Sequence, residues 1–303
     1  MHRRSTSMSS NTKPPLVSQA SHLDMIAIRA TCPHRVNGRP FREASNLVTY
    51  PLMGRDRIDI EPGVWPERTS SNLTGRAFMP LDPTLLTRTK AFIFDAYGTL
   101  FDVHSAVQRH AAVLGPDAAR LSEIWRAKQL EYSWVLSLAD SYEPFWVLTQ
   151  RALDFAFERC PSVDRSSRSV LLDAYRTLAA YPEVGPTLEE LRRKEYRTAI
   201  LSNGDPGMLT DAVSSAGIAD KLDAVLSVDT VGIYKTSPRA YELVLSAMQV
   251  RPDEVVFVSS NRWDIAGAAA FGLTPVWVNR SELPEEYPGL EPAAVVGDLG
   301  AIT

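Results

Sequence analysis

The chain has little of several features that mark particular classes of protein. Only two cysteines occur among its 303 residues, Cys32 and Cys160, and they lie far apart without metal-ligand spacing. A disulfide framework is therefore not indicated, and we expect a reducing, cytoplasmic location. No apolar run approaches the roughly 18 residues that a membrane-spanning helix needs. With a formal net charge of -4 at pH 7, the chain also has no basic excess that would favour nucleic acid or an anionic membrane as a partner.

The sequence contains enough hydrophobic residues to form a sizeable core. Hydrophobic residues make up 45% of the chain, and its length suits one large domain or two ordinary ones. No internal repeat divides it. These bulk properties are typical of a soluble globular protein.

Residues 1–88 differ in character from the rest of the chain. They are basic on balance whereas the remainder is acidic, and polar residues, Pro and Gly are scattered through residues 1–72 without a sustained period. We therefore predict a poorly ordered N-terminal extension. One explanation is a transit peptide, because Met1–Ser7 is basic and no acidic residue precedes Asp24, although no amphipathic helix supports it. The explanation we prefer is that the working protein begins near Met79.

The most informative stretch is an apolar run that ends on a carboxylate and then turns at a glycine. Ala91–Phe94 is short, continuous and apolar, which predicts a strand buried on both faces of a parallel sheet. The chain leaves this strand at Asp95. Because ligands of open α/β sheets bind at the carboxyl ends of strands, Asp95 is a candidate site residue. The alternative is a structural Asp that caps the turn.

The following segment is helical, and strands resume after it. Residues 103–181 show helical spacing of apolar side chains in three stretches, at 121–139, 145–156 and 170–181. We therefore predict an α/β protein whose parallel-sheet core, residues 89–102 and 182–303, is interrupted by an inserted all-helical cap at 103–181. Further short strands are predicted at residues 198–201, 224–228, 255–258 and 275–278.

Polar side chains gather at or just beyond the ends of the predicted strands. Parallel topology would bring such ends to one edge of the sheet. Scattered polar loop residues are the alternative for each of them. The set comprises Asp95 with Thr99, Ser202 with Asn203, Lys235, and Ser259 with Asn261 and Asp264.

Five segments carry a resemblance to a known family: Phe94–Val103, Trp125–Tyr132, Leu201–Gly204, Tyr234–Lys235 and Val258–Asp264. In this order they resemble the (S)-2-haloacid dehalogenases of the haloacid dehalogenase-like superfamily. The resemblance covers about residues 90–280 and leaves the first 88 unmatched. It implies a Rossmann-like core with a helical cap, no metal or organic cofactor, and hydrolysis of short (S)-2-haloalkanoic acids to (R)-2-hydroxyacids and halide. Because family members commonly pair through cap helices, it also points to a homodimer.

Two residues within these segments distinguish the expected reaction from phosphoryl transfer. Phosphatases of the superfamily carry a second Asp two residues after the nucleophile and an acidic Mg²⁺ ligand after a later strand, where this chain has Tyr97 and Ser260. A phenol replaces a carboxylic acid poorly, and a hard cation prefers carboxylate oxygen. Phosphoryl transfer without either group loses its charge neutralisation, whereas halide leaves as a stable anion without a proton.

The resemblance implies a role for each catalytic position. Asp95 is expected to attack C2 of the haloacid with inversion, forming an ester that water then hydrolyses. Lys235 matches the family lysine that keeps this nucleophile ionised. Arg126 matches the cap arginine that accompanies halide release. Support for Asp95, Lys235 and the attacking water is expected from Thr99, Ser259, Asn261 and Asp264.

The same resemblance implies a set of residues that contact the substrate, which is expected to be a small-molecule 2-haloacid together with water. Some would bind its carboxylate or the halide, and others would wall the pocket or hydrogen-bond within it. The expected set is Ala96 and Tyr97 through backbone N–H groups, Arg126, Ser202 and Asn203 through polar side chains, and Phe145, Tyr241 and Trp263.

Three departures from the family pattern bear on substrate preference. Thr236 follows the lysine where proline is usual, Ala127 follows the arginine where glutamine is frequent, and Arg262 adds a cation beside Asn261. They leave open a related displacement, such as hydrolytic opening of a strained ring next to a carboxylate. A superfamily phosphatase acting on a small phosphoester and a catalytically silent binding protein of the same fold also stay open at the level of sequence.

Overall fold

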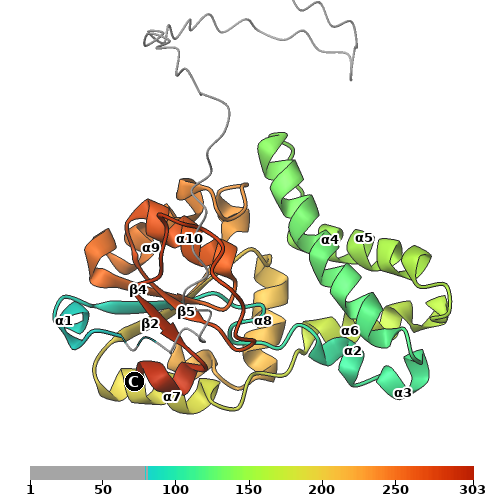
Figure 1. The fold of residues 1–303 in the computed structure, drawn as a ribbon, viewed down its shortest axis with the longest axis horizontal. Coiled ribbons are helices and arrows are strands. Elements are labelled where there is room, and N and C mark those ends of the chain that lie inside the picture. The colour runs from blue at the N-terminus through green and yellow to red at the C-terminus, as the bar shows by residue number, and fades with distance from the viewer. Residues whose placement is uncertain (1–78, 80) are drawn as a thin grey trace, which may run out of the picture. The chain divides into compact units, whose positions relative to one another are not determined.

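The structure is a computed structural model that describes Met79 and residues 81–303 (Figure 1). Most of the predicted N-terminal extension, residues 1–78 and Pro80, lies outside the described residues. The described part of that segment contains a short helix, α1 (Pro83–Leu86), and Met79 pairs antiparallel with Val295. Within the described part of the chain, no helix combines the length and apolar character that crossing a bilayer requires.

Six parallel strands form the sheet, in the order β3-β2-β1-β4-β5-β6. The central strand β1 is buried on both faces, as its continuous apolar sequence predicts. The five predicted strands are confirmed, whereas β6 was not predicted, because a three-residue segment gives no pattern. Their bounds are β1 Ala91–Phe94, β2 Arg197–Ser202, β3 Ala224–Ser227, β4 Val255–Ser259, β5 Thr274–Val278 and β6 Ala294–Val296.

The helices of the core connect these strands. Two of them show the expected terminal signals: the Asp205 side chain accepts a hydrogen bond from the backbone N–H of Met208 at the start of α8, and Gly272 ends α10 in a left-handed conformation with φ 93°. The core helices are α7 Val184–Arg193, α8 Pro206–Ser215, α9 Pro238–Met248 and α10 Arg262–Phe271, with 3-10 turns at Ala219–Lys221, Val228–Thr230, Pro252–Glu254 and Leu299–Ile302.

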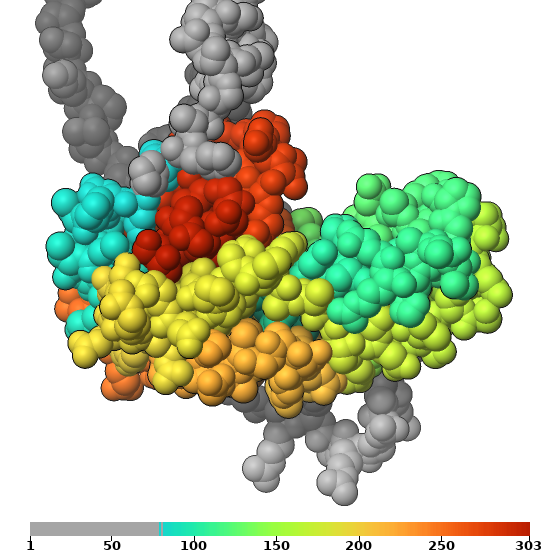
Figure 2. Space-filling model, turned by 90° about the horizontal axis from the view of Figure 1, so that it is seen from below, coloured from blue at the N-terminus to red at the C-terminus, as the bar shows by residue number. Residues whose placement is uncertain are grey.

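Between β1 and α7 the chain is helical, as predicted for residues 103–181. In Figure 2 these residues, coloured green, gather as a body of their own. The two longest helices are joined by buried polar contacts, because Trp125 Nε1 donates to the Thr149 carbonyl and Gln129 Nε2 donates to Thr149 Oγ1. The helices are α2 Ser105–Gln108, α3 Ala111–Leu114, α4 Ala118–Leu138, α5 Phe145–Arg159 and α6 Arg168–Arg176, with a 3-10 turn at Arg165–Ser167.

One helical prediction extended too far. The stretch 170–181 was predicted as a single helical repeat, but α6 ends at Arg176. The chain beyond it is extended, because Ala180 pairs with Phe101 and the Tyr181 N–H donates to the Leu100 carbonyl at 3.1 Å. This extended segment and the segment after β1 are the two connections between the helical body and the sheet.

Candidate active site

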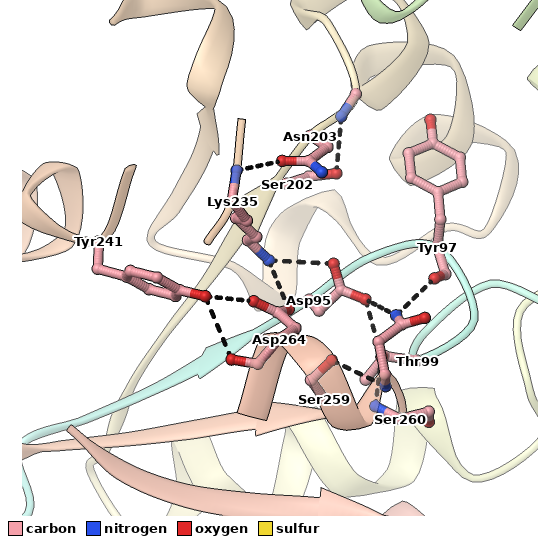
Figure 3. A network of polar contacts seen from close by, with 12 residues as sticks. Asp95, Tyr97, Thr99, Ser202, Asn203, Lys235, Tyr241, Ser259, Ser260 and Asp264 are labelled. Atoms are coloured by element: carbon pink, nitrogen blue, oxygen red, sulfur yellow. Dashed lines mark hydrogen bonds and ion pairs between the residues drawn. The ribbon is translucent and has the colours of Figure 1, made fainter. Parts of the chain in front are cut away.

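Asp95 stands at the end of β1, where the chain turns sharply over Gly98. The turn closes when the Gly98 N–H donates to the Phe101 carbonyl at 2.7 Å, and Gly98 has φ 95°, which favours glycine. The Asp95 carboxylate is 5% exposed and accepts three hydrogen bonds (Figure 3). The donors are Lys235 Nζ to Oδ1 at 3.1 Å, and Asn261 Nδ2 at 2.8 Å and Thr99 Oγ1 at 3.0 Å to Oδ2.

Lys235 lies between two carboxylates in the interior. Its Nζ is 3.1 Å from Asp95 Oδ1 and 2.9 Å from Asp264 Oδ2, and the residue is 1% exposed. Burial alone would lower the pKa of Lys235, but the charges of Asp264 and Asp95 together outweigh it and raise that pKa above its ordinary value. The ammonium group is therefore retained, and it supplies one positive charge to two acids.

Asp264 is the partner of Lys235 farther from the pocket. It lies in the first turn of α10, but its fully buried side chain binds Lys235 and accepts a hydrogen bond from Tyr241 Oη at 2.8 Å. Burial raises the pKa of Asp264 to about 6, against the lowering effect of Lys235. Its side chain thus does more than interact favourably with the helix dipole.

Tyr241 was predicted to contact the substrate, and the structure places it elsewhere. Its side chain is fully buried on α9 and hydrogen-bonds the carboxylate and the backbone carbonyl of Asp264. Asp264 and Lys235 separate it from Asp95 (Figure 3). The prediction that Tyr241 hydrogen-bonds within the site agrees with this position, but its grouping with the substrate contacts does not.

The turn after β4 is fastened to the turn after β1. The Ser260 N–H donates to Thr99 Oγ1 at 2.8 Å, so that Thr99 bridges this turn and Asp95. The Ser259 hydroxyl accepts from the Asn261 N–H at 3.1 Å and thereby holds the residue that bonds Asp95 Oδ2. Ser259 accordingly touches Asn261 rather than Asp95. No group of three or more His, Cys, Asp and Glu side chains among the described residues is arranged to hold a metal ion.

A small pocket opens beside Asp95, between the sheet edge and helices α4 and α5. Its volume is about 10 Å³, which leaves room for about one water molecule. Every predicted substrate-contacting side chain except those of Ala96 and Tyr241 lines it. The lining residues are Asp95, Tyr97, Arg126, Leu130, Phe145, Ser202, Asn203 and Trp263.

Several polar groups at this pocket can form further hydrogen bonds. Among the described residues, neither Tyr97 Oη nor Asn203 Nδ2 has a hydrogen-bond partner, although both atoms are buried. The backbone N–H groups of Ala96 and Tyr97 likewise donate to no described residue. Buried polar groups normally find partners, so these atoms are suited to bind a polar ligand.

Arg126 reaches the pocket from α4. Its Nη2 donates to the Tyr97 carbonyl at 3.1 Å and lies 3.4 Å from Asn261 Oδ1. The guanidinium therefore contacts both turns that hold Asp95 and brings a second positive charge to the pocket. An anionic ligand would meet Arg126 on the side of α4 and Lys235 on the side of the sheet.

Two residues of the site were not predicted. Leu130 lines the pocket one helical turn after Arg126, a spacing that could have identified it. Tyr175 stacks on the ring of Tyr97 with centroids 5.8 Å apart, and its hydroxyl donates to Gln129 Oε1 at 3.2 Å. Nothing in the sequence marks Tyr175, because its contact depends on how α6 is placed against β1.

None of the three residues that depart from the family pattern lines the pocket beside Asp95. Arg262 is 3% exposed, but its guanidinium bonds Glu285 and the carbonyls of Tyr287 and Leu290, so it is not a cation of the site. Ala127 is exposed on α4. Thr236 lines a second, larger cavity on the other side of Trp263.

Comparisons with known proteins agree with this geometry. The family model of the haloacid dehalogenase-like hydrolases matches residues 89–272. (S)-2-haloacid dehalogenase 1 of Pseudomonas sp. (strain CBS-3) is 48% identical over 199 residues, which cover 65% of this chain and 88% of that protein.

Two solved structures are similar as well. The crystal structure of a dehalogenase with an intermediate complex has a TM-score of 0.69 and 44% identity, and covers 70% of this chain and 95% of that one. The L-2-haloacid dehalogenase from Xanthobacter autotrophicus with chloropropionic acid covalently bound has a TM-score of 0.64 and 36% identity, with 70% and 96% covered.

Proposed function

The chain belongs to the haloacid dehalogenase-like hydrolases and groups there with the (S)-2-haloacid dehalogenases, and from this premise we propose that it hydrolyses short (S)-2-haloalkanoic acids to (R)-2-hydroxyacids and halide. One observation carries the proposal. A carboxylate held by Lys235, Thr99 and Asn261 faces a pocket whose other charged group is the cation of Arg126. That arrangement suits an anionic substrate attacked at carbon.

In the first step, an Asp95 oxygen attacks C2 of the haloacid. A C–O bond forms as the carbon–halogen bond breaks, and the bonding electron pair leaves with the halide, so C2 inverts. The product of this step is an ester of Asp95. The relative with chloropropionic acid covalently bound supports an intermediate of this kind.

In the second step, water attacks the carbonyl carbon of the Asp95 ester. The bond between that carbon and the ester oxygen breaks, and the hydroxyacid leaves with an oxygen that came from Asp95. Of the two protons that water gives up, one passes to this departing oxygen and the other to solvent as the Asp95 carboxylate is regenerated. The network of Asp264, Lys235 and Asn261 lies beside the carboxylate and is suited to orient the water and stabilise the developing charge.

Electrostatics is the main difficulty of the first step, because an anionic nucleophile must approach an anionic substrate. Lys235 and Arg126 offset this repulsion from opposite sides. The unpartnered Nδ2 of Asn203 and the free N–H groups after β1 can then receive the substrate carboxylate, together with Ser202, while Arg126 and Asn203 receive the halide. We assign Phe145, Leu130 and Trp263 to the apolar walls.

The proposal includes catalysis without a metal or an organic cofactor. Its support is chemical, because Tyr97 and Ser260 take the places of the acid and the metal ligand that phosphoryl transfer would use. We further propose that residues 103–181 act as a cap over the core formed by 89–102 and 182–303, that two copies pair through cap helices, and that the enzyme works in the cytoplasm.

Halide release tests the proposed reaction. With EDTA present, the enzyme should release chloride from (S)-2-chloropropionate and form (R)-lactate, and it should leave the R enantiomer unchanged. Multiple turnovers in H₂¹⁸O should place the label on the peptide that contains Asp95. Magnesium-dependent phosphate release without any halide would favour a phosphatase, and neither product would favour a binding protein; either result would overturn the proposal.

A further inference from the structure

A second and much larger cavity adjoins the active-site pocket. Its volume is about 590 Å³, against about 10 Å³ for the pocket beside Asp95. Trp263 lines both cavities, and Lys235 also lines the larger one, although its side chain is fully buried against Asp95 and Asp264. The two spaces therefore share a wall at the reacting end of the site.

Two helix faces run from the small pocket into the larger cavity. On α4, Leu130 lines the pocket, and Trp134, Ser137 and Leu138 line the cavity at the spacing of one helical face. On α10, Trp263 is followed by Ala266, Gly267 and Ala270 at the same spacing. Residues 263 to 270 advance by roughly 10 Å along α10. The cavity is thus a channel of this order of length that begins at the active site.

The wall between the two spaces is a pair of tryptophans. The rings of Trp134 and Trp263 meet edge to face, with centroids 5.6 Å apart and planes at 80°. At the far end Leu138 is 90% exposed, which marks the opening to solvent. Trp263 lines both the channel and the pocket, so its side chain stands between the two spaces.

The wall of the channel at Tyr287 and Leu290 is contacted by Arg262, one of the three residues that depart from the family pattern. Arg262 donates through Nη2 to the Leu290 carbonyl at 2.9 Å and to the Tyr287 carbonyl at 3.3 Å. Its guanidinium also lies 5.2 Å from the centroid of the Tyr287 ring. Tyr287 and Leu290 both line the channel, so this buried arginine shapes the channel although it does not enter the pocket.

We propose that the channel between α4 and α10 is the subsite for the alkyl chain of longer 2-haloalkanoic acids, with Trp263 as the partition that admits the chain. The inference rests on the proposed function and names the substrate class of that site. Polar groups of the pocket, Ser202, Asn203 and Arg126, face the carboxylate and halogen, which leaves the apolar side of Leu130 and Trp263 for the substituent on C2. Beyond that side the lining is largely apolar, which suits a hydrocarbon chain.

A variant that fills the channel tests the subsite. Ala270 is exposed on α10 and lines the channel but not the pocket, so Ala270→Phe should leave kcat/KM for (S)-2-bromopropionate unchanged. For (S)-2-bromooctanoate it should lower kcat/KM at least about tenfold, because each methylene buried contributes roughly fourfold. The matched control is Ala119→Phe, at an exposed alanine of α4 that lines neither cavity, and it should alter neither substrate.

Shortening Trp263, the partition, should favour the longer substrate, whereas Ala270→Phe should disfavour it. Trp263→Ala should raise the ratio of kcat/KM for 2-bromooctanoate to that for 2-bromopropionate by at least about fivefold, even where absolute rates fall. Turnover of 2-bromopropionate alone by the unchanged enzyme, or an equal effect of Ala270→Phe on both substrates, would overturn the subsite only. Absence of bromide from both substrates would overturn the proposed reaction and the subsite with it.

Discussion

The ammonium nitrogen of Lys235 lies 3.1 Å from Oδ1 of Asp95, although 140 residues separate the two along the chain. The fold makes this contact because β1 is central, so that the turn after it can be reached by the loop that follows β3. Asp264 on α10 approaches the same nitrogen from the other side at 2.9 Å. The buried ammonium group of Lys235 thus binds both Asp95, at the end of β1, and Asp264 on α10.

Replacing the nucleophile should abolish turnover without unfolding the protein. Asp95→Asn keeps the shape of the side chain, but its amide cannot attack C2, and we expect kcat to fall by at least about a thousandfold. Halide release from (S)-2-chloropropionate measures the rate, and the thermal midpoint measures the fold.

Asp102→Asn is the matched control for this substitution. Asp102 lies at the end of the same motif, and its Oδ1 accepts only a backbone hydrogen bond from His104 at 2.9 Å. Its rate should stay within about twofold, since Oδ1 of asparagine can still accept this hydrogen bond and the lost charge touches no reacting group. Near-normal activity of Asp95→Asn would remove Asp95 from the nucleophile role.

Removing the cation should cost stability as well as activity. Lys235→Met leaves Asp95 and Asp264 buried without their shared partner, and breaking a buried ion pair costs about 3 to 5 kcal/mol. Urea unfolding should show this loss. The double variant Lys235→Met/Asp264→Asn carries one buried charge fewer and should recover part of the stability but none of the activity. A double variant as unstable as the single one would contradict the coupling of Lys235 with Asp264.

Much of this site could be predicted from the sequence, for a definite physical reason. A strand buried on both faces, such as β1, is a short apolar run that stops abruptly at a polar residue, so that Asp95 and Ser202 stand out at their strand ends. Parallel topology then brings such ends together. Neither step requires knowledge of how the helices pack.

What could not be predicted depends on the rotation of helices against the sheet. Tyr241 was expected among the substrate contacts, yet the face of α9 that carries it is turned towards Asp264. Arg262 follows Asn261 directly, but its side chain leaves on the opposite side, towards the loop at Tyr287. Local sequence fixes that these residues are helical or near a strand end. Which way each side chain points is decided by packing between distant segments.

The pH dependence of kcat/KM should reflect the ionisation of Asp264. Its pKa is raised to about 6 by burial, so the residue is ionised above that pH and becomes neutral as the pH falls through it. A neutral Asp264 no longer shares Lys235, whose charge then acts on Asp95 alone and weakens it as a nucleophile. We expect kcat/KM to fall on the acid side with a midpoint near pH 6, and to level off below it at the reduced value of the form with neutral Asp264.

Asp264→Asn is the control for that acid limb. The variant has no group to titrate at this position, so its profile between about pH 5 and 8 should be flat at a reduced level. The raised pKa of Lys235 keeps the ammonium group charged beyond its ordinary value of 10.5, so no loss of this group is expected across that interval. An unchanged midpoint in Asp264→Asn would assign the limb to another residue.

Gly204 should prove intolerant of a side chain because of Tyr97. A Cβ at Gly204 would lie 2.7 Å from Cε2 of the Tyr97 ring, and that ring is buried and stacked on Tyr175. The ring must then shift within the pocket that it lines. We expect Gly204→Ala to cost about 1 to 3 kcal/mol of stability through overpacking, and to lower kcat/KM at least about tenfold through misplacement of the substrate.

Gly207→Ala, three residues further along, separates this clash from any general effect of adding a methyl group. Gly207 is exposed in the first turn of α8, and its added Cβ would meet only Asp205 Oδ1, at an ordinary 3.7 Å. The substitution should raise the free energy of unfolding by up to about 1 kcal/mol, because alanine restricts the unfolded chain, and leave the rate unchanged. If Gly204→Ala behaved like Gly207→Ala in urea unfolding and halide release, Tyr97 would not be confined as the stacked rings indicate.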